Sequence, residues 1–447
     1  MISSLNFLID QNNTCREAMI LIKKNMKGIV FVINKKKQIV GSLTDGDIRT
    51  KLLKDNNLNQ KVKFFMEKNF RYVHNANDRE TILKLLDQKF KIIPVISKSK
   101  KLIDLINKVE PLLDKKIIVR SRSPARVSLA GGGTDITSFF FDSGGSGISF
   151  TIAKYCNVTI SKRNDKKIII YSNDINKKII FKDLNAIRYN GVLDIIKAPI
   201  KLLKPNFGFE IFVETEVKPG SGLGGSAAVS SAVIGVINYF QERKLSKYEI
   251  SEYAFQAERI ELNILGGWQD QYSTVFGGCN IIEFKKGKNL VHNLILPNNI
   301  SDELERRIII CDTGIPHKGS AIHKKKKDKN KQIEYGRKLK TIVNKIKSEL
   351  LTGKLDDFGS LINQTWILKK KLDKKMTNSK IIKLEKNLIG SDLASGCRLL
   401  GTGGGGHMLF YINPENRFNF LKKIKKLNIK YYNIKFDNVG LKVWETE

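Results

Sequence analysis

The chain has 447 residues, enough for several domains, and its 41% hydrophobic and 9% aromatic residues are typical of a globular protein. Five widely spaced cysteines without a CxxC pair argue against a disulfide scaffold and a zinc site, and they predict a reducing, cytoplasmic compartment. The longest apolar runs fall short of the roughly 20 residues that a membrane helix needs, and the N-terminus lacks signal-peptide features. We therefore expect a soluble protein without a membrane partner.

The formal net charge of +35 is the unusual bulk property. A strongly basic protein can bind nucleic acid. Here, however, the excess is mostly lysine spread along the whole chain, and no zinc-finger or RNP motif accompanies it. Lysines on solvated helix faces and a basic surface suited to small anionic substrates account for the charge, so we expect no nucleic-acid partner.

Residues 1–110 alternate short strands and helices, in an approximate repeat of two strands and a helix. The runs "GIVFVIN" and "QIVGSLT" are strand-like, whereas "CREAMILIKKN" and "DRETILKLLDQ" carry helical spacing. The second copy of the repeat reads "KIIPVISKSKKLIDLINKV". A new strand pattern opens near Pro111 and predicts a domain boundary there.

Two further regions follow. Over 116–297, strands such as "NVTISK", "KIIIYS" and "FEIFVETEV" alternate with helices that come after glycine-rich loops. Over 298–447, a buried strand, "RRIIICDTG", precedes a long lysine-rich helical region and then two stretches that contain strands, "GCRLLGTGGGGHMLFYINPE" and "IKYYNIKFDNVGLKVWE". This order of elements predicts an α+β fold with a front module and two further domains.

The stretch "KPGSGLGGSAA" lies between the strand "FEIFVETEV" and a helix that we expect to begin near Ala227. At such a turn, unpaired backbone N–H groups and the positive end of the helix dipole form an anion site. Glycines also let a polyphosphate approach the backbone. The loop matches neither the Walker pattern nor the complete dinucleotide fingerprint, and by itself it is more typical of a tight structural turn.

Two other glycine-rich stretches change this interpretation. "SPARVSLAGGGTDITSFF" ends a strand in a triple glycine, and "ASGCRLLGTGGGGHMLFY" holds four consecutive glycines between two strands. From about Lys116 to the C-terminus, the three loops resemble in order the sugar motif, the phosphate loop and the C-terminal glycine loop of the GHMP small-molecule kinases. The resemblance implies a two-domain α+β fold, ribosomal-S5-domain-2-like and then ferredoxin-like, that transfers a phosphoryl group from ATP with Mg²⁺.

Within that family, the form "LAGGGTD" resembles the kinases of D-glycero-D-manno-heptose 7-phosphate, whereas galactokinases show "GEHTDY" there. This resemblance implies a phosphosugar substrate and phosphorylation of its anomeric C1 hydroxyl, giving the 1,7-bisphosphate on the route to nucleotide-activated heptose. Two alternatives stay open. One is another GHMP sugar-1-kinase of fucose or galactose type, and the other is a non-catalytic sugar or nucleotide sensor.

The resemblance also implies roles for residues around the phosphate loop. It places ATP on Pro219, Gly220, Ser221, Gly222, Leu223, Gly224, Gly225, Ser226 and Ala227. Ser226 and Glu258 are the implied Mg²⁺ ligands, and hard oxygen ligands are what Mg²⁺ requires. Gly225 stands where the family usually has a serine, so one hydroxyl donor is missing. A helix N-cap role for Ser226 is compatible with the same position.

Asp270, in "GGWQDQYSTVFGG", matches the family's aspartate that faces the acceptor hydroxyl. Arg126, in "PARV", matches the arginine of the sugar motif, and it could pair with Asp270 and stabilise charge on the attacking oxygen. A carboxylate with the ordinary pKa of about 4 is a weak base, so we expect positioning to matter more than proton affinity. A capping role for Asp270 and a surface position for Arg126 are the alternatives.

The implied sugar contacts are Gly132, Gly133, Thr134, Asp135, Gly404 and Gly405. A hydroxyl beside a carboxylate suits the vicinal hydroxyls of a sugar. His407 is expected to be a solvated edge residue or a satisfied core histidine rather than a catalytic group. The basic stretch "GIPHKGSAIHKKKKDK", with His317, Lys318 and His323, is a candidate lid near the sugar phosphate, although a charge run is usually a solvated face.

The stretch "IVGSLTDGDI" resembles one module of a CBS pair, in which a threonine and an aspartate can hold the ribose of adenosine. Here these residues are Thr44 and Asp47. The second copy of the repeat lacks them, so the resemblance implies at most half of a nucleotide site. An adenine-nucleotide sensor and a structural module that forms a homodimer both remain open for residues 1–110.

Overall fold

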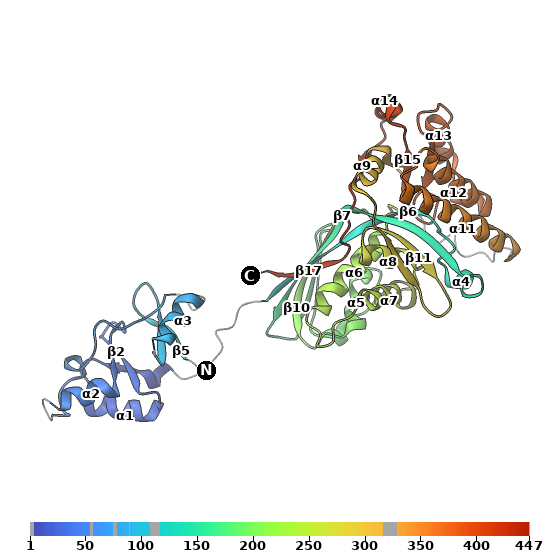
Figure 1. Ribbon diagram of the computed structural model, residues 1–447. Helices are drawn as coiled ribbons and strands as arrows, with labels where there is room; N and C mark the ends of the chain where they lie inside the picture. Colours follow the sequence, from blue (N-terminus) through green and yellow to red (C-terminus); the bar gives the residue numbers. More distant parts are fainter. Residues whose placement is uncertain are drawn as a thin grey trace. The chain divides into compact units, whose positions relative to one another are not determined.

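The structure is a computed structural model that describes residues 4–53, 57–74, 78–88, 90–107, 117–315 and 329–446. The chain divides into two compact units, Met1–Lys115 (unit 1) and Lys116–Glu447 (unit 2) (Figure 1). No helix among those described is both long enough and apolar enough to cross a membrane.

The described residues of unit 1 form two small sheets and three α-helices. The strands are β1 (Leu8–Asp10), β2 (Ile29–Ile33) and β3 (Ile39–Thr44) in one sheet, and β4 (Ile92–Ile96) and β5 (Leu102–Asn107) in the other. The helices are α1 (Cys15–Asn25), α2 (Asp45–Leu52) and α3 (Arg79–Asp87). The two helices predicted from their spacing are confirmed as α1 and α3. The end of the second repeat lies outside the described residues.

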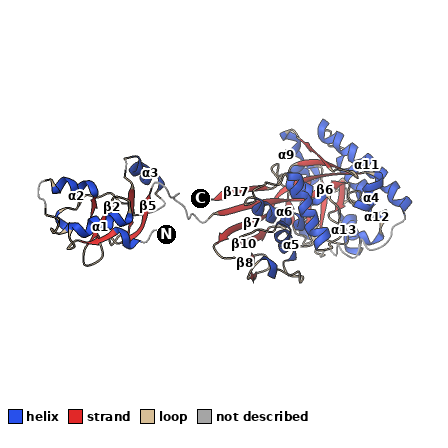
Figure 2. Cartoon of the chain, turned by 90° about the horizontal axis from the view of Figure 1, so that it is seen from below, coloured by secondary structure: helices blue, strands red, loops and turns tan. Residues whose placement is uncertain are grey.

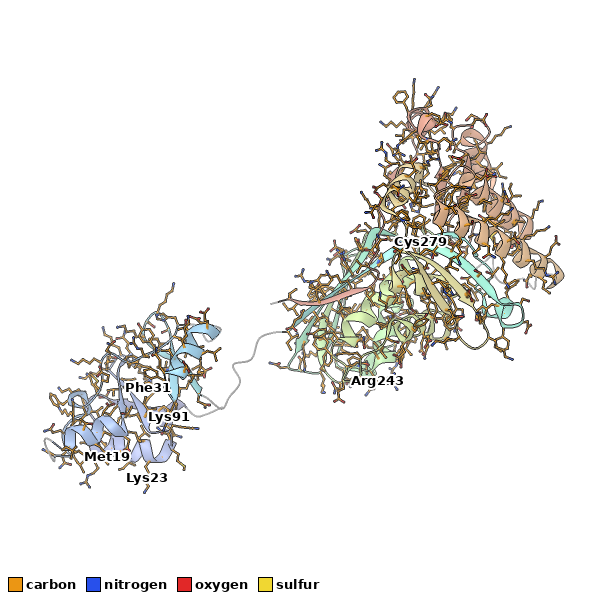
Figure 3. The ribbon with its side chains drawn as sticks, in the orientation of Figure 1. Met19, Lys23, Phe31, Lys91, Arg243 and Cys279 are labelled. Carbon is orange, nitrogen blue, oxygen red and sulfur yellow. The ribbon has the colours of Figure 1, made fainter. Side chains whose placement is uncertain are left out.

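One apolar cluster joins the two sheets of unit 1. Phe31 of β2 is buried with Ile39 of β3 and with Ile92 and Ile96 of β4. Figure 3 shows the side chains of this unit and labels Phe31 together with Met19 of α1. Unit 1 is therefore a small folded module with a core of its own.

Thr44 and Asp47 bind each other in the structure. The Thr44 hydroxyl donates to Asp47 Oδ2 at 2.7 Å, and the amide of each residue donates to the side chain of the other at 2.8 and 3.1 Å. This is a capping box at the start of α2. The two side chains thus stabilise a helix end, as the structural interpretation of this motif requires.

Unit 2 is built on an eight-stranded sheet of order β12-β11-β7-β10-β8-β9, with β6 paired to both β7 and β17. Its strands are β6 (Ile118–Ala130), β7 (Gly145–Arg163), β8 (Ile168–Ser172), β9 (Lys177–Phe181), β10 (Gly208–Thr215), β11 (Cys279–Phe284), β12 (Leu290–Leu294) and β17 (Lys442–Thr446). Only the β8–β10 pair is parallel among these pairs. The long strand β7 pairs with β6, β10 and β11, so it is the centre of the sheet.

Helices cover one face of this sheet (Figure 1). They are α5 (Asp194–Leu203), α6 (Gly225–Asn238), α7 (Lys247–Phe255), the π-helical turn η4 (Gln256–Glu261) and α8 (Gln269–Phe276), while α4 (Thr137–Ser143) follows β6. Helix α6 contacts β6 and β7, and every residue of it from Ala227 to Ile237 is buried. Its small residues allow this close approach: a Cβ on Gly235 would lie 3.0 Å from the Val443 side chain of β17.

The rest of unit 2 contains a four-stranded antiparallel sheet of order β14-β15-β13-β16. The strands are β13 (Ile308–Asp312), β14 (Gly396–Leu399), β15 (His407–Tyr411) and β16 (Tyr431–Asn433). The helices are α9 (Asn298–Arg307), α11 (Lys329–Thr352), α12 (Phe358–Leu372), α13 (Ser379–Leu388) and α14 (Arg417–Lys426). Figure 2 shows α11, α12 and α13 at the end of unit 2 remote from β8 and β10. The lysine-rich helical region predicted from the sequence is confirmed.

The two sheets of unit 2 share a core. One buried cluster contains Val127 of β6 and Ile148 of β7 together with Ile310 of β13 and Leu339 of α11. The last strand, β17, also returns to pair with β6. The residues that follow the second sheet are thus part of the first, which fixes the loops of the two halves relative to one another.

We predict that Gly277, between α8 and β11, is required for stability. Its φ is +73°, and a Cβ there would lie 2.0 Å from the backbone nitrogen of Gly440, where the chain turns back towards β17. Gly277→Ala should lower the free energy of unfolding by about 2 kcal/mol or more. Gly287→Ala is the control, because a Cβ on Gly287 would meet no atom within 4 Å. Equal thermal midpoints of the two variants would contradict this account.

Candidate active site

The start of α6 presents unpaired amides next to an exposed loop. Gly224 is the N-cap of the helix, with φ of +74° and no side-chain cap. The helix begins at Gly225, two residues before the expected start at Ala227. Among the hydrogen bonds of the described residues, Ala228 is the first in the helix whose N–H has an acceptor, the Gly224 carbonyl. The preceding amides and the helix dipole therefore form an anion site.

The phosphate loop and the C-terminal glycine loop touch backbone to backbone. A Cβ on Gly222 would lie 2.6 Å from the Leu400 carbonyl oxygen, and a Cβ on Gly401 would lie 2.7 Å from Gly222 Cα. Both glycines also have positive φ, of +79° and +71°. Glycine is needed here because the loops approach so closely. The structure thus brings together two of the three glycine loops that the sequence separates by about 180 residues.

His407 holds the same two loops together. It is buried, and both its backbone N–H and its ring Nδ1 lie within 2.9 Å of the Ser221 carbonyl oxygen. Of the two roles expected for His407, the satisfied core histidine is the one observed. The backbone of Gly404 bonds within the protein: its N–H donates to the Met376 carbonyl at 2.9 Å, and its carbonyl accepts from Asn378 at 3.0 Å. Its polar groups are therefore engaged within the protein.

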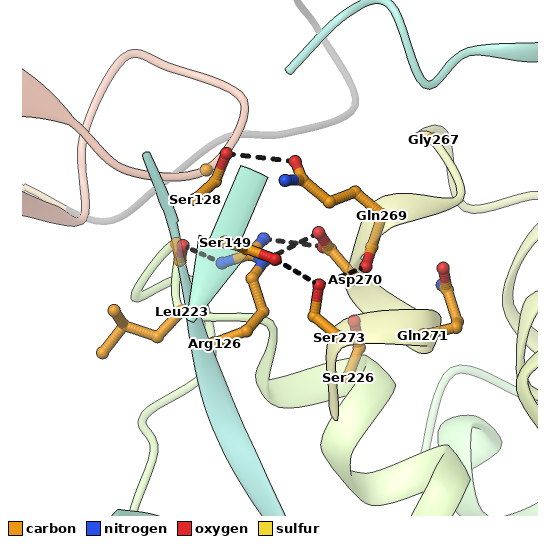
Figure 4. Close-up of polar contacts among 12 residues, drawn as sticks. Arg126, Ser128, Ser149, Leu223, Ser226, Gly267, Gln269, Asp270, Gln271 and Ser273 are labelled. Atoms are coloured by element: carbon orange, nitrogen blue, oxygen red, sulfur yellow. Dashed lines mark hydrogen bonds and ion pairs between the residues drawn. The ribbon is translucent and has the colours of Figure 1, made fainter. Parts of the chain in front are cut away.

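Arg126 and Asp270 form the bidentate pair that was expected from their motifs (Figure 4). Arg126 Nε donates to Asp270 Oδ1 and Arg126 Nη2 donates to Asp270 Oδ2, both at 2.7 Å. Arg126 Nη1 donates to the Gly222 carbonyl at 2.6 Å, and its backbone N–H donates to the Leu223 carbonyl at 2.9 Å. Arg126 is 4% exposed, so neither alternative role, surface arginine or simple cap, describes this pair.

The charge of Asp270 is set by this arginine. Burial by itself raises the pKa of Asp270, but the charge and hydrogen bonds of Arg126, with the charges of Arg259 and Lys369, outweigh burial and hold the pKa below its usual value. The carboxylate therefore stays ionised at neutral pH and is a weak proton acceptor. Positioning of the carboxylate by Arg126 is therefore what the structure shows for Asp270, while its role in a reaction stays a prediction.

The beginning of α8 is anchored on the sheet, which fixes the direction of Asp270. The Ser128 hydroxyl of β6 donates to Gln269 Oε1 at 3.0 Å. The hydroxyls of Ser149 of β7 and Ser273 of α8 are 2.7 Å apart, and Ser273 donates to the Gln269 carbonyl (Figure 4). These contacts hold the residues on both sides of Asp270, so the carboxylate cannot swing freely.

Glu258 and Ser226 meet at the start of α6, as expected for two metal ligands. Glu258 is fully buried on the π-helical turn η4, and its Oε2 accepts from the Ser226 hydroxyl at 2.6 Å. Its Oε1 accepts from Gln271 at 2.8 Å, and Arg259 lies 3.3 Å from Oε2. Gln271 Oε1 and Arg259 Nε are buried without a partner. One carboxylate and one hydroxyl beside a phosphate-binding turn fit Mg²⁺, which completes its shell with phosphates and water.

This fit needs ligands from outside the protein. Among the described residues, no three histidine, cysteine, aspartate or glutamate side chains are grouped closely enough to hold a metal ion. The described residues therefore fit a metal ion that takes its remaining ligands from the phosphate oxygens of a bound nucleotide.

The sugar loop reaches Asp270 through Asp135. The Asp135 carboxylate accepts from the amides of Gly133 at 2.9 Å and Gln269 at 3.2 Å, and a Cβ on Gly267 would lie 2.0 Å from it. Burial raises the pKa of Asp135, and the nearby charge of Asp270 raises it further. Asp135 thus links the triple-glycine loop to the start of α8.

Thr134 is placed differently from the expectation of a sugar contact. Its side chain is fully buried, and its hydroxyl lies 2.8 Å from the Gly131 carbonyl and 2.9 Å from the Ser146 carbonyl. The hydroxyl also accepts from the Ser146 amide at 3.2 Å. Thr134 therefore closes the loop rather than facing a ligand. His317, Lys318 and His323 of the expected lid lie outside the described residues.

Several buried cations and their neighbours near the loops are not predicted by local sequence patterns. Lys369 of α12 is buried, and its Nζ donates to the Gly401 carbonyl. Arg398 of β14 is buried and donates to the Leu129 carbonyl. Tyr335 of α11 donates its hydroxyl proton to the Gly132 carbonyl at 2.8 Å. Lys369 lies in a lysine-rich helix that does not distinguish it, and Tyr335 reaches the sugar loop only through tertiary packing. Arg398 lies in the stretch that leads into the third glycine loop, but its contact with β6 also arises only through tertiary packing.

Several known proteins are similar to this chain. A family model described as "GHMP kinases N terminal domain" matches residues 190–278. A curated D-glycero-alpha-D-manno-heptose 7-phosphate kinase from Campylobacter jejuni is 33% identical over 338 residues, which cover 73% of this chain and 98% of that protein. A mevalonate kinase from Methanocaldococcus jannaschii is 26% identical over an alignment of 313 residues. The alignment covers 65% of this chain and 93% of that protein.

A solved structure is similar to this chain as well. The structure of a D-glycero-D-manno-heptose 1-phosphate kinase from Bacteriodes thetaiotaomicron aligns with a TM-score of 0.62 at 25% identity, over 74% of this chain and 99% of that one. Together, the fold, the site geometry and these similarities identify the chain as a small-molecule kinase of mixed α and β structure. The chain belongs to the GHMP kinase family.

We predict that the Arg126–Asp270 pair also stabilises the fold. Arg126→Met leaves the mostly buried Asp270 carboxylate without its partner, and should lower the free energy of unfolding by about 3 kcal/mol. Asp270→Asn in the same chain should restore part of this loss, because it removes the unpaired charge. Chemical denaturation of the two single variants and the double variant measures the coupling.

The control is Arg243→Met. Arg243 pairs with Glu249 at the surface, where its side chain is 80% exposed, so the unfolding midpoint should hardly change. Additive losses in the Arg126 and Asp270 variants would contradict the coupling.

Proposed function

We propose that the protein is an ATP-dependent kinase that phosphorylates the anomeric C1 hydroxyl of D-glycero-D-manno-heptose 7-phosphate. The product is the 1,7-bisphosphate, which serves nucleotide-activated heptose synthesis. The observation that carries the proposal is the position of the Asp270 carboxylate, which Arg126 joins directly to the phosphate loop. The similarity to the Campylobacter jejuni heptose 7-phosphate kinase supports the choice of sugar.

The donor side of the proposed reaction is the loop from Pro219 to Ala227. The free amides at the start of α6 bind phosphate oxygens, and the dipole of this buried helix favours their negative charge. Lys369 and Arg259 both lie close enough to Asp270 to lower its pKa, so positive charge surrounds the point of transfer. Phosphoryl transfer depends mainly on such positioning and charge neutralisation.

Glu258 and Ser226 would hold Mg²⁺ against the phosphates. The bound ion supplies neutralisation of the charge on the transferred phosphoryl group. Glu258 is kept in place for this role by Gln271, whose amide donates to Glu258 Oε1 at 2.8 Å.

On the acceptor side, Asp270 accepts a hydrogen bond from the anomeric hydroxyl and orients its oxygen towards the γ-phosphate. Because the pKa of Asp270 is low, the carboxylate mainly orients the attacking hydroxyl. It does not remove the hydroxyl proton before the attack. Arg126 stabilises the negative charge that develops on the attacking oxygen. Gly132, Gly133, Asp135 and Gly405 remain our proposed contacts to the sugar. Thr134 and Gly404 support the two loops from within.

A second candidate is another sugar-1-kinase of the same family, acting on an unphosphorylated hexose or 6-deoxyhexose. An L-fucokinase/L-fucose-1-P guanylyltransferase from Bacteroides fragilis is 26% identical over 344 residues, and this similarity supports the alternative. A sensor without catalysis is less well supported, because Arg126, Asp270, Ser226 and Glu258 are all present and in contact within their pairs.

For unit 1 we propose a structural role rather than adenine-nucleotide binding. Thr44 and Asp47, the residues that a nucleotide would use, are bonded to each other in the α2 cap. For the compartment we propose the cytoplasm, since all five cysteines are free and buried.

A panel of sugars with Mg-ATP tests the proposed function. D-glycero-D-manno-heptose 7-phosphate should be the best acceptor by kcat/KM, and phosphorus NMR should place the new phosphate on C1. Fucose, galactose and unphosphorylated heptose serve as the comparison sugars. A higher kcat/KM for any of these three would replace the heptose 7-phosphate assignment.

Asp270→Asn tests the proposed mechanism. The neutral amide keeps the size of the side chain but loses its charge, so kcat should fall by about a hundredfold or more. The dissociation constant for ATP should change less than about threefold, because Asp270 faces the acceptor. Asp302→Asn, on the exposed side of α9, is the matched control and should keep full activity. Near-normal turnover by Asp270→Asn would remove Asp270 from the mechanism.

A further inference from the structure

Arg398 is a buried charge without a counter-ion. It lies on β14 with 4% of its surface exposed. Its Nη1 donates to the Leu129 carbonyl, and its Nε is buried without any hydrogen-bond partner. No described carboxylate lies within ion-pair distance of Arg398. The neighbouring groups whose charges shift its pKa are Tyr335 and Arg126. Arg126, by comparison, is fully paired with Asp270.

An arrangement of this kind is unfavourable in the free protein. A buried cation normally has an acidic partner, because its loss of hydration costs several kcal/mol otherwise. Burial and the positive charge of Arg126 lower the pKa of Arg398 to about 10, although Tyr335 opposes them. The guanidinium is still protonated at neutral pH. The site is therefore suited to an anion that arrives from outside.

The position of Arg398 assigns this anion to the acceptor side of the site. Leu129, which accepts its hydrogen bond, lies at the end of β6, and Ala130 alone separates it from Gly131 of the sugar loop. Tyr335, its other neighbour, donates to the Gly132 carbonyl of that loop. Lys369 and Arg259 instead bond to the Gly401 carbonyl and to Glu258, beside the phosphate loop. Of these three cations, Arg398 is thus the one whose neighbours are the strand that leads into the sugar loop and the tyrosine that bonds to this loop.

We infer that Arg398 binds the phosphate group that the sugar substrate already carries, and that it selects phosphorylated over unphosphorylated sugars. This inference rests on the proposed function and deepens it. Guanidinium is well suited to phosphate, since it donates two parallel hydrogen bonds. A phosphate here would pair the unbonded Nε and supply the missing negative charge. Binding thus converts an unfavourable buried charge into a favourable contact.

The kinetic test compares two acceptors in three proteins. For Arg398→Met, kcat/KM with D-glycero-D-manno-heptose 7-phosphate should fall by about 10- to 100-fold, the value of a charge-assisted hydrogen bond. With unphosphorylated D-glycero-D-manno-heptose it should stay near the wild-type value. Arg122→Met is the matched control, since Arg122 is another arginine with an unpartnered buried Nε, but it lies over the ring of Tyr155. Equal losses on both sugars would show a purely structural role and overturn the inference.

A binding measurement separates this inference from the proposed reaction. With ADP filling the donor side, inorganic phosphate should raise the thermal midpoint of the wild type and of Arg122→Met. It should not raise that of Arg398→Met. Absence of a phosphate effect in the wild type, or an equal effect in Arg398→Met, overturns the anion site whatever sugar the enzyme uses. A phosphate effect that depends on Arg398, in a protein inactive on every heptose, supports the site and rejects only the heptose substrate.

Discussion

One arginine fixes the geometry of the whole site. Arg126 binds both oxygens of Asp270, and it also binds the carbonyls of Gly222 and Leu223 in the phosphate loop. Strand β6, the phosphate loop and helix α8 therefore cannot move independently. Because the guanidinium is buried, these hydrogen bonds form in surroundings of low dielectric, where they are strong and where their loss is costly. The proposed acceptor carboxylate and the proposed phosphate donors are thus positioned by the same side chain.

Glycine makes the remaining contacts of the site possible. The phosphate loop touches the C-terminal glycine loop at Gly222 and Gly401, with no room for a Cβ. Asp135 reaches the start of α8 because Gly267 has no side chain to obstruct it. These glycines are therefore needed for backbone approach within the protein, while the amides at the start of α6 stay free for phosphate. The same residue type serves packing in one place and ligand binding in another.

Local patterns predicted the elements and the three loops, because each lies in one continuous stretch whose residues stay neighbours in the fold. The Arg126–Asp270 pair joins two motifs 144 residues apart, and only the resemblance of both motifs to those of GHMP kinases implied it. The sequence did not predict the internal use of Thr134, whose hydroxyl is engaged by Ser146 on the following strand. Nor did it predict Arg398, whose environment is formed by β6 and α11. Such roles depend on which distant strands and helices pack together. The sequence could not decide between ribose binding and helix capping for Thr44 and Asp47, because a capping box has the same residue spacing.

A crystal structure with a non-hydrolysable ATP analogue, Mg²⁺ and D-glycero-D-manno-heptose 7-phosphate would test the central claim most directly. The account predicts that the triphosphate contacts the amides of Gly225, Ser226 and Ala227. It also predicts that the C1 hydroxyl lies at hydrogen-bond distance, about 3 Å, from the Asp270 carboxylate. A triphosphate bound away from the start of α6, or an acceptor hydroxyl out of reach of Asp270, would contradict it.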